Sequence, residues 1–177
     1  MENGHYTRAQ RQLHWWVAIL VAGEYLGQKA MRRAMQRVDE TTAPALGDFL
    51  ITTAHTMAGL TVFALIVWRV KLRREHPVRI GAGSVSPRWA RLARAWHWSL
   101  YAAITSMVAT GATAYYTDIE LAARVHGIGK WVLGTLVIGH MLASLVHWFI
   151  FKDQVLHQML GNRGDADTIR GSDQSPD

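Results

Sequence analysis

Histidine is the main source of ligand chemistry in this chain, because its 177 residues include nine histidines and no cysteine. Without cysteine there can be no disulfide framework, no thiolate metal site, no iron–sulfur cluster held by protein thiolates and no thiol nucleophile. A neutral imidazole nitrogen remains a good ligand for iron, copper or zinc. The positions of the histidines therefore decide which chemistry the sequence can support.

Two histidines, His126 and His140, stand fourteen residues apart in one apolar part of the chain. On a helix, fourteen residues turn through roughly 1400°, within about 40° of four full turns, so both rings leave the same face. At about 1.5 Å per residue the two rings lie about 21 Å apart along the helix axis. This offset predicts two separate sites, one near each surface of a membrane, and each site needs a partner from another helix.

Three long stretches that could position these residues contain no Asp, Glu, Lys or Arg: Phe49–Trp68, Trp98–Tyr116 and Trp131–Phe151. A hydrocarbon core of about 30 Å needs roughly 20 helical residues, so each stretch is long enough to cross it. Buried helices of a soluble protein are the alternative interpretation. Three such stretches in so short a chain favour membrane spans.

A fourth apolar stretch, Leu13–Gly23, is shorter and is followed by Glu24. It could be an interfacial helix or a signal peptide, but no A-x-A-like cleavage site follows it. We interpret it as a retained span in which Glu24 faces the bundle interior or lies near the interface. The predicted fold is therefore all-α, an integral membrane four-helix bundle formed by residues 1–160. Its spans are expected at about 13–30, 49–70, 96–116 and 128–151, followed by a disordered cytoplasmic tail over 161–177.

Lysine and arginine concentrate before the first span and between the second and third spans, and the formal net charge is +6. The positive-inside rule therefore places both termini and the central loop in the cytoplasm. A basic loop can also indicate nucleic-acid binding. Its position between two spans favours orientation and attraction to anionic membrane lipid instead, so no nucleic-acid partner is expected.

Depth in the membrane predicts the partners of the two histidines. His55 is the other intramembrane histidine near the outer side, where it matches His126, and His14 matches the inner depth of His140. Facing helices of a bundle can hold haem between two imidazoles and bury the macrocycle against apolar side chains. Small residues beside the histidines would leave room for a macrocycle, although they serve equally well in ordinary helix packing. These small residues include Gly59, Gly134 and Gly139.

Four segments of the chain resemble the bacterial cytochrome b561 family: MENGHYTRAQRQLHWWVAIL, AHTMAGLTVFALIVWRVKLR, ARAWHWSLY and HGIGKWVLGTLVIGHMLASLVHWFIFKD. The likeness covers most of residues 1–160. It implies two b-type haems, with His14 and His140 as axial ligands on the cytoplasmic side and His55 and His126 on the periplasmic side. That assignment agrees with the depth argument. Because the chain has no C-x-x-C-H motif, the haems would be bound non-covalently.

The resemblance also implies an oxidoreductase, since the family includes a four-span, quinone-linked member that is described as a superoxide oxidase and passes electrons from superoxide to ubiquinone. The wider superfamily includes cytochrome b subunits that anchor hydrogenases and formate dehydrogenases, so a subunit that serves a separate redox partner is the alternative. A haem-free membrane transporter is a third hypothesis. Contacts to quinone or to haem propionates could come from Arg8, Arg69, Arg94, His97 and His147. Basic residues on the outer side could steer superoxide or could be ordinary solvated charges: Lys29, Arg32, Arg33, Arg37, Arg124 and Lys130.

Overall fold

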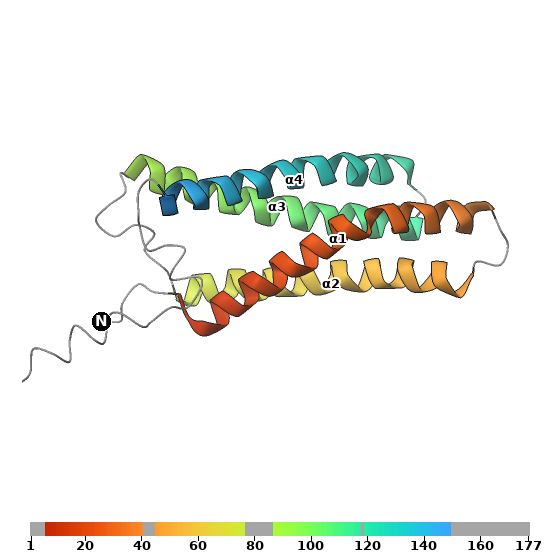
Figure 1. Ribbon diagram of the computed structural model, residues 1–177, viewed down its shortest axis with the longest axis horizontal. Helices are drawn as coiled ribbons and strands as arrows, with labels where there is room; N and C mark the ends of the chain where they lie inside the picture. Colours follow the sequence, from red (N-terminus) through yellow and green to blue (C-terminus); the bar gives the residue numbers. More distant parts are fainter. Residues whose placement is uncertain (1–5, 41–44, 77–86, 118, 150–177) are drawn as a thin grey trace, which may run out of the picture.

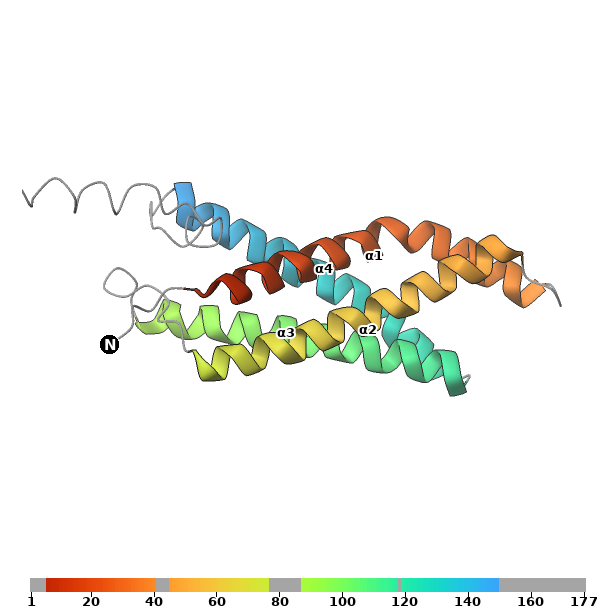
Figure 2. The ribbon, with the colours of Figure 1, turned by 90° about the horizontal axis from the view of Figure 1, so that it is seen from below.

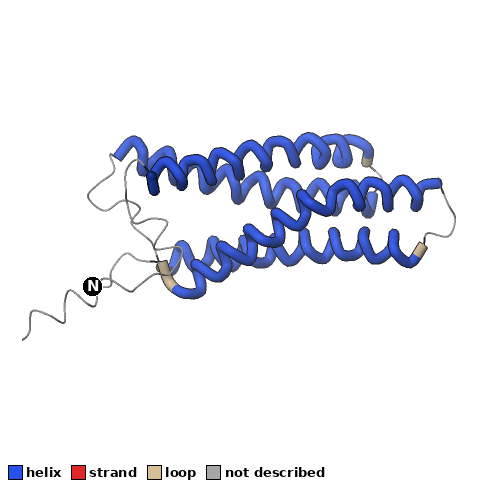
Figure 3. Tube along the Cα trace, in the orientation of Figure 1, coloured by secondary structure: helices blue, strands red, loops and turns tan. Residues whose placement is uncertain are grey.

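The computed structural model describes residues 6–40, 45–76, 87–117 and 119–149. Four helices account for almost all of this part of the chain, and no strand occurs in it (Figures 1 and 3). They are α1 (Arg8–Glu40), α2 (Leu46–Glu75), α3 (Pro87–Thr117) and α4 (Glu120–Phe149). The predicted all-α four-helix bundle is confirmed. The predicted tail and the last two residues of the fourth predicted span lie outside the described residues.

The helices extend well past the charge-free stretches of the sequence. Each has 30 to 33 residues, which corresponds to about 45–50 Å and exceeds the roughly 30 Å of a hydrocarbon core. Their additional turns carry the charges. Asp48 and Glu120 lie in the first turns of α2 and α4, whereas Arg73 and Arg74 lie in the last turn of α2. Each of these charges complements the helix dipole at its end.

The four helices form two antiparallel hairpins, α1 with α2 and α3 with α4 (Figures 1 and 2). The hairpins contact each other mainly through α2 and α3. We call the end where α1 and α3 finish the hairpin end, and the end where α1 begins and α4 finishes the terminal end (Figure 1). Any site that draws on α1 and α4 together must therefore lie between the two hairpins.

A small apolar core joins the hairpins near the middle of their length. Its buried residues come from α2, α3 and α4: Val62, Ile66, Tyr101, Ile104 and Leu133. Partly buried residues of α1 pack against them, including Leu20 and Tyr25. The Tyr25 hydroxyl donates a hydrogen bond to the backbone oxygen of Lys130 in α4. The core therefore separates the hairpin end of the bundle from the terminal end.

Large apolar side chains on the outside of the bundle are exposed, among them Leu26 at 85% and Trp131 at 71%. Such a surface is unfavourable in water but costs nothing against lipid tails. In the described part of the chain, α2 and α4 are long and apolar enough to cross a membrane. α1 contains Glu24 and Lys29, and the second half of α3 is rich in Thr, Ala and Tyr. Spanning by α1 and α3 stays a prediction, supported by their packing along α2 and α4.

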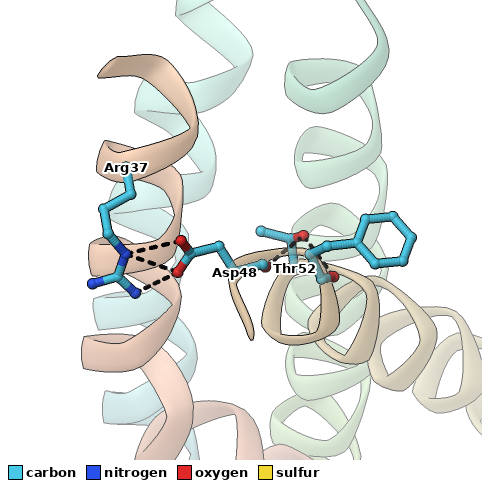
Figure 4. A network of polar contacts seen from close by, with 4 residues as sticks. Arg37, Asp48 and Thr52 are labelled. Atoms are coloured by element: carbon cyan, nitrogen blue, oxygen red, sulfur yellow. Dashed lines mark hydrogen bonds and ion pairs between the residues drawn. The ribbon is translucent and has the colours of Figure 1, made fainter. Parts of the chain in front are cut away.

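An ion pair fixes the hairpin end of α1 against α2 (Figure 4). The Arg37 Nε donates to both Asp48 carboxylate oxygens, at 2.8 and 2.9 Å, and Asp48 is only 3% exposed. The Arg37 guanidinium holds the pKa of this carboxyl below its usual value. The Thr52 hydroxyl donates to the Asp48 backbone oxygen at 3.1 Å, and Ala34 is fully buried in α1. The first hairpin is thus closed by a specific polar contact.

Candidate cofactor sites

Near the hairpin end, His55 of α2 faces His126 of α4 across the gap between the hairpins. Their ring centroids are 6.2 Å apart and their planes are almost perpendicular, at 88°. Both side chains are partly buried. The structure therefore brings together the outer pair that depth in the membrane predicts.

The Nδ1 atom of each of these rings already has a partner. The Nδ1 of His55 pairs with the Glu24 carboxylate of α1, and the Nδ1 of His126 lies 2.9 Å from the Met107 carbonyl oxygen of α3. In each case the Nδ1–H donates, which leaves the Nε2 lone pair as the ligand atom. Metal-bound histidines characteristically hold their second nitrogen in this way. All four helices thus contribute to the hairpin-end pair.

Gly111 of α3 makes room for the His126 ring. A Cβ atom added at Gly111 would lie 2.8 Å from Cε1 and 2.9 Å from Nδ1 of His126, closer than packed atoms approach. Gly59, which the sequence places one turn from His55, has nothing within 4 Å of such an atom. Sequence reasoning missed Gly111 and Met107, because only the packing of α3 on α4 shows which glycine lies beside a ligand.

The other two glycines that stand out in the sequence serve helix packing. A Cβ added at Gly139 would lie 2.5 Å from the Trp96 indole, and one added at Gly134 would lie 3.2 Å from the Tyr25 hydroxyl. The Trp96 Nε1 also donates a hydrogen bond to the Leu136 backbone oxygen at 3.1 Å. These glycines allow aromatic side chains of α1 and α3 to approach α4 closely, which agrees with the ordinary packing interpretation.

Toward the terminal end, three imidazoles gather rather than two. The ring centroids of His14 in α1 and His140 in α4 are 6.1 Å apart, and the centroid of His97 in α3 is 5.2 Å from that of His140. The Nδ1 of His97 lies 2.6 Å from the Ala93 backbone oxygen of its own helix. The predicted terminal-end pair is therefore brought together, with His97 as a third ring beside it.

The distances within the two predicted pairs suit axial ligation of one iron. An imidazole nitrogen lies about 2 Å from a first-row metal and about 1 Å from the centre of its own ring, so two axial rings have centroids about 6 Å apart. The separations of 6.1 and 6.2 Å match this value, whereas the 5.2 Å between His97 and His140 is shorter. The residues present therefore fit a bis-histidine haem at each level. The role of His14, His55, His126 and His140 as ligands stays a prediction.

A buried cation lies beside the terminal-end histidines. Arg69 of α2 is 8% exposed; its Nε donates to the Tyr101 hydroxyl at 3.1 Å and its Nη1 to the Gln10 backbone oxygen at 2.9 Å. Gln10 lies one turn before His14 in α1, and Tyr101 lies one turn after His97 in α3, so these bonds hold Arg69 at the level of the terminal-end histidines. Within the described residues no carboxylate forms an ion pair with it. An anionic group would find an uncompensated positive charge here.

Arg69 belongs to a small polar pocket whose other lining residues come from the start of the chain and from α2 and α3. These are Tyr6, Gln10, Arg73 and Tyr101. Burial raises the pKa of the Tyr6 hydroxyl, an effect that the nearby Arg73 and Arg69 oppose. Of the sequence-predicted quinone or propionate contacts, Arg69 lines this pocket, whereas Arg8, Arg94, His97 and His147 do not. The sequence alone did not indicate the uncharged lining residues Tyr6, Gln10 and Tyr101, because neither charge nor spacing distinguishes them.

A family model for prokaryotic cytochrome b561 matches residues 5–162, a range that contains both histidine pairs and Arg69. The chain belongs to this family. It is therefore a membrane cytochrome b that transfers electrons and binds haem b. The chain is also 29% identical to the cytochrome b562 of Cereibacter sphaeroides over 159 residues, which cover 89% of this chain and 96% of that protein.

Proposed function

We propose that this family member carries two haems b and conducts electrons across the membrane between them, with superoxide as donor and ubiquinone as acceptor. The observation that carries the proposal is the pair of facing histidines at each level of the bundle, with centroids 6.2 and 6.1 Å apart. α4 contributes one histidine to each pair, so a single rigid helix fixes the distance between the two sites. The proposal includes His55 and His126 as one set of ligands and His14 and His140 as the other.

When bound, haem would supply one-electron redox chemistry, with His55 and His126 holding one haem and His14 and His140 holding the other. The chain's own residues orient and shield the sites. Glu24 and the Met107 carbonyl hold the His55 and His126 rings by their Nδ1 atoms. The apolar core between the two levels excludes water from the path. At the terminal end, the Arg69 guanidinium would hold a haem propionate or a quinone oxygen, with His97 and His147 as further candidate contacts.

The orientation that we propose puts the hairpin end in the periplasm and the terminal end in the cytoplasm of a bacterial inner membrane. Support comes from the basic residues that concentrate in the last turns of α2, in the sequence after it and in the first turns of α3. It also comes from the start of α1 and the end of α4, which lie at one end of the bundle (Figure 1). Exposed basic residues near the hairpin end of α1 would attract the superoxide anion: Lys29, Arg32 and Arg33. Arg124 contributes less, because it is paired with Glu120 at 2.7 Å.

Stopped-flow spectroscopy of the purified cytochrome tests the proposal directly. Superoxide should reduce both haems, and ubiquinone should reoxidise them. Replacing Lys29, Arg32 and Arg33 together by Gln should slow the reduction and weaken its dependence on ionic strength, whereas Lys71→Gln at the other end should not. If superoxide fails to reduce haems that dithionite does reduce, superoxide is not the electron donor. The favoured function is then that of a cytochrome b subunit that transfers electrons for a separate redox enzyme. A purified protein without haem would instead support a transporter.

A further inference from the structure

The two histidine pairs lie in opposite electrostatic surroundings. At the hairpin end, the carboxylate that contacts His55 belongs to Glu24, whose side chain is 24% exposed in the middle of α1. At the terminal end, the guanidinium of Arg69 is buried and bonded to Gln10, one turn before His14, and to Tyr101, one turn after His97. An anion therefore accompanies one pair and a cation accompanies the other.

Glu24 acts on its site through the histidine ring. A carboxylate that accepts a hydrogen bond from the Nδ1–H of an axial ligand makes that ligand more basic and stabilises the oxidised metal. The other ring of the pair, His126, has only a neutral carbonyl as its partner. Another charge near this pair is that of Lys130, whose Nζ lies 5.4 Å from the centroid of the Trp131 ring. Glu24 is thus the charge in direct contact with a ligand.

Arg69 has the opposite effect at the terminal end. Its hydrogen bonds go to neutral oxygens of Tyr101 and Gln10, so its charge is not compensated by a carboxylate among the described residues. A nearby positive charge favours the state of an iron centre that carries less positive charge, which is the reduced state. The low dielectric of the bundle interior strengthens this interaction.

We infer that Glu24 and Arg69 give the two sites different reduction potentials, low at the hairpin end and high at the terminal end. Electrons would then move downhill from the hairpin end to the terminal end. In the orientation proposed above, this direction opposes a membrane potential that is negative inside, and a downhill step offsets that cost. The inference rests on the proposed two-haem arrangement. It assigns positioning roles to Glu24 and Arg69, which act through the ligands and the local field.

A redox titration of the purified holoprotein, followed by haem absorption, tests the role of Glu24. Glu24→Gln keeps a hydrogen-bond acceptor for His55 but removes the charge. It should raise the reduction potential of one haem by about 59 mV relative to the other. For one electron, this shift is a roughly tenfold change in the ratio of reduced to oxidised haem at a given potential. Glu24→Asp should restore most of the original value. Glu120→Gln, which removes a carboxylate from the same end without a histidine contact, should shift neither potential.

The same titration tests Arg69. Arg69→Gln should lower the potential of the other haem, while Lys71→Gln, an exposed cation of the same helix, should leave both unchanged. The haem whose titration step is absent in His55→Ala should be the one whose potential Glu24→Gln shifts. The inference is overturned if either variant moves both potentials equally or moves neither. It is also overturned if both Glu24 variants simply lose the haem, since Glu24 would then be structural.

These outcomes are separate from those that test the proposed function. Equilibrium potentials need neither superoxide nor quinone, so a cytochrome that ignores superoxide can still show both shifts. If His55→Ala leaves both haems in place, the ligand assignment of the proposed function fails. If ligation is as proposed and the potentials stay unshifted, only the present inference fails.

Discussion

The two ends of the bundle build similar histidine pairs by different means. At the hairpin end both rings are held at Nδ1 by side chains or backbone of the remaining two helices, and Gly111 shapes the space around one of them. At the terminal end three imidazoles and a buried cation gather, and within the described residues no hydrogen bond orients the ring of His14 or His140. Hydrogen bonds and close packing therefore fix the two rings at the hairpin end. At the terminal end, the site depends more on which imidazoles bind the iron and on the charge of the buried cation.

The largest expected effect comes from removing the ligands. His55→Ala and His126→Ala should each abolish the same haem, and His14→Ala and His140→Ala should each abolish the other, because each substitution removes one of the two imidazoles between which that haem would be held. Haem content should fall from two per chain to one, as measured by absorption of the purified protein, and electron paramagnetic resonance should show which signal is lost. If His147→Ala rather than His140→Ala removes the terminal-end haem, the pairing is wrong.

His97 provides a sharper test of the terminal end. With its centroid 5.2 Å from His140 rather than about 6 Å, His97 is not expected to be the axial partner. His97→Ala should keep two haems per chain and change the low-temperature spectrum of the terminal-end haem only slightly. The opposite result, with haem lost in His97→Ala and kept in His14→Ala, would make His97 the ligand and reverse the assignment.

Gly111 tests how tightly the hairpin end is specified. Gly111→Ala places a Cβ about 2.8 Å from the His126 ring, an overpacking that costs about 1–3 kcal/mol. The hairpin-end haem should bind more weakly, which a haem titration of the apoprotein would measure. Gly47→Ala is the matched control, since its Cβ meets nothing within 4 Å and Gly47 lies about two turns before His55 in α2. Equal binding in the two variants would show that the His126 ring moves freely.

The smallest effect is expected at the Arg37–Asp48 ion pair, which lies beyond the hairpin-end histidines. Because Arg37 lowers the pKa of Asp48 in the folded chain, this contribution to stability is complete above the unfolded pKa of about 3.9 and is lost as the pH falls through the folded value. Asp48→Asn should therefore lower the unfolding temperature at pH 7 by only about 2 °C. The difference from the parent chain should vanish once the pH lies well below the pKa of Asp48 in the folded chain. If the two unfolding temperatures still differ at that pH, the effect of Asp48→Asn comes from packing rather than from the ion pair.

The sequence by itself determined the helices, two of the spans and the α4 histidine of each pair. Long charge-free stretches predict spanning helices because the bilayer sets a minimum length, and α2 and α4 meet that test. The same-face arrangement of His126 and His140 follows from the helical repeat alone. Depth in the membrane then predicted which histidines of α1 and α2 face them, and the structure brings those rings together.

Only the tertiary structure decided how each site is completed. The contact between Glu24 and His55 joins residues 31 positions apart, and Tyr25 reaches α4 over 105 positions. Such contacts depend on the rotation and tilt of each helix against its neighbours, which the periodicity of one helix cannot specify. The same is true of Gly111 beside His126 and of His97 beside His140. Helix geometry is local and can be read from a sequence, whereas the partners of each ring are set by the packing of one hairpin on the other.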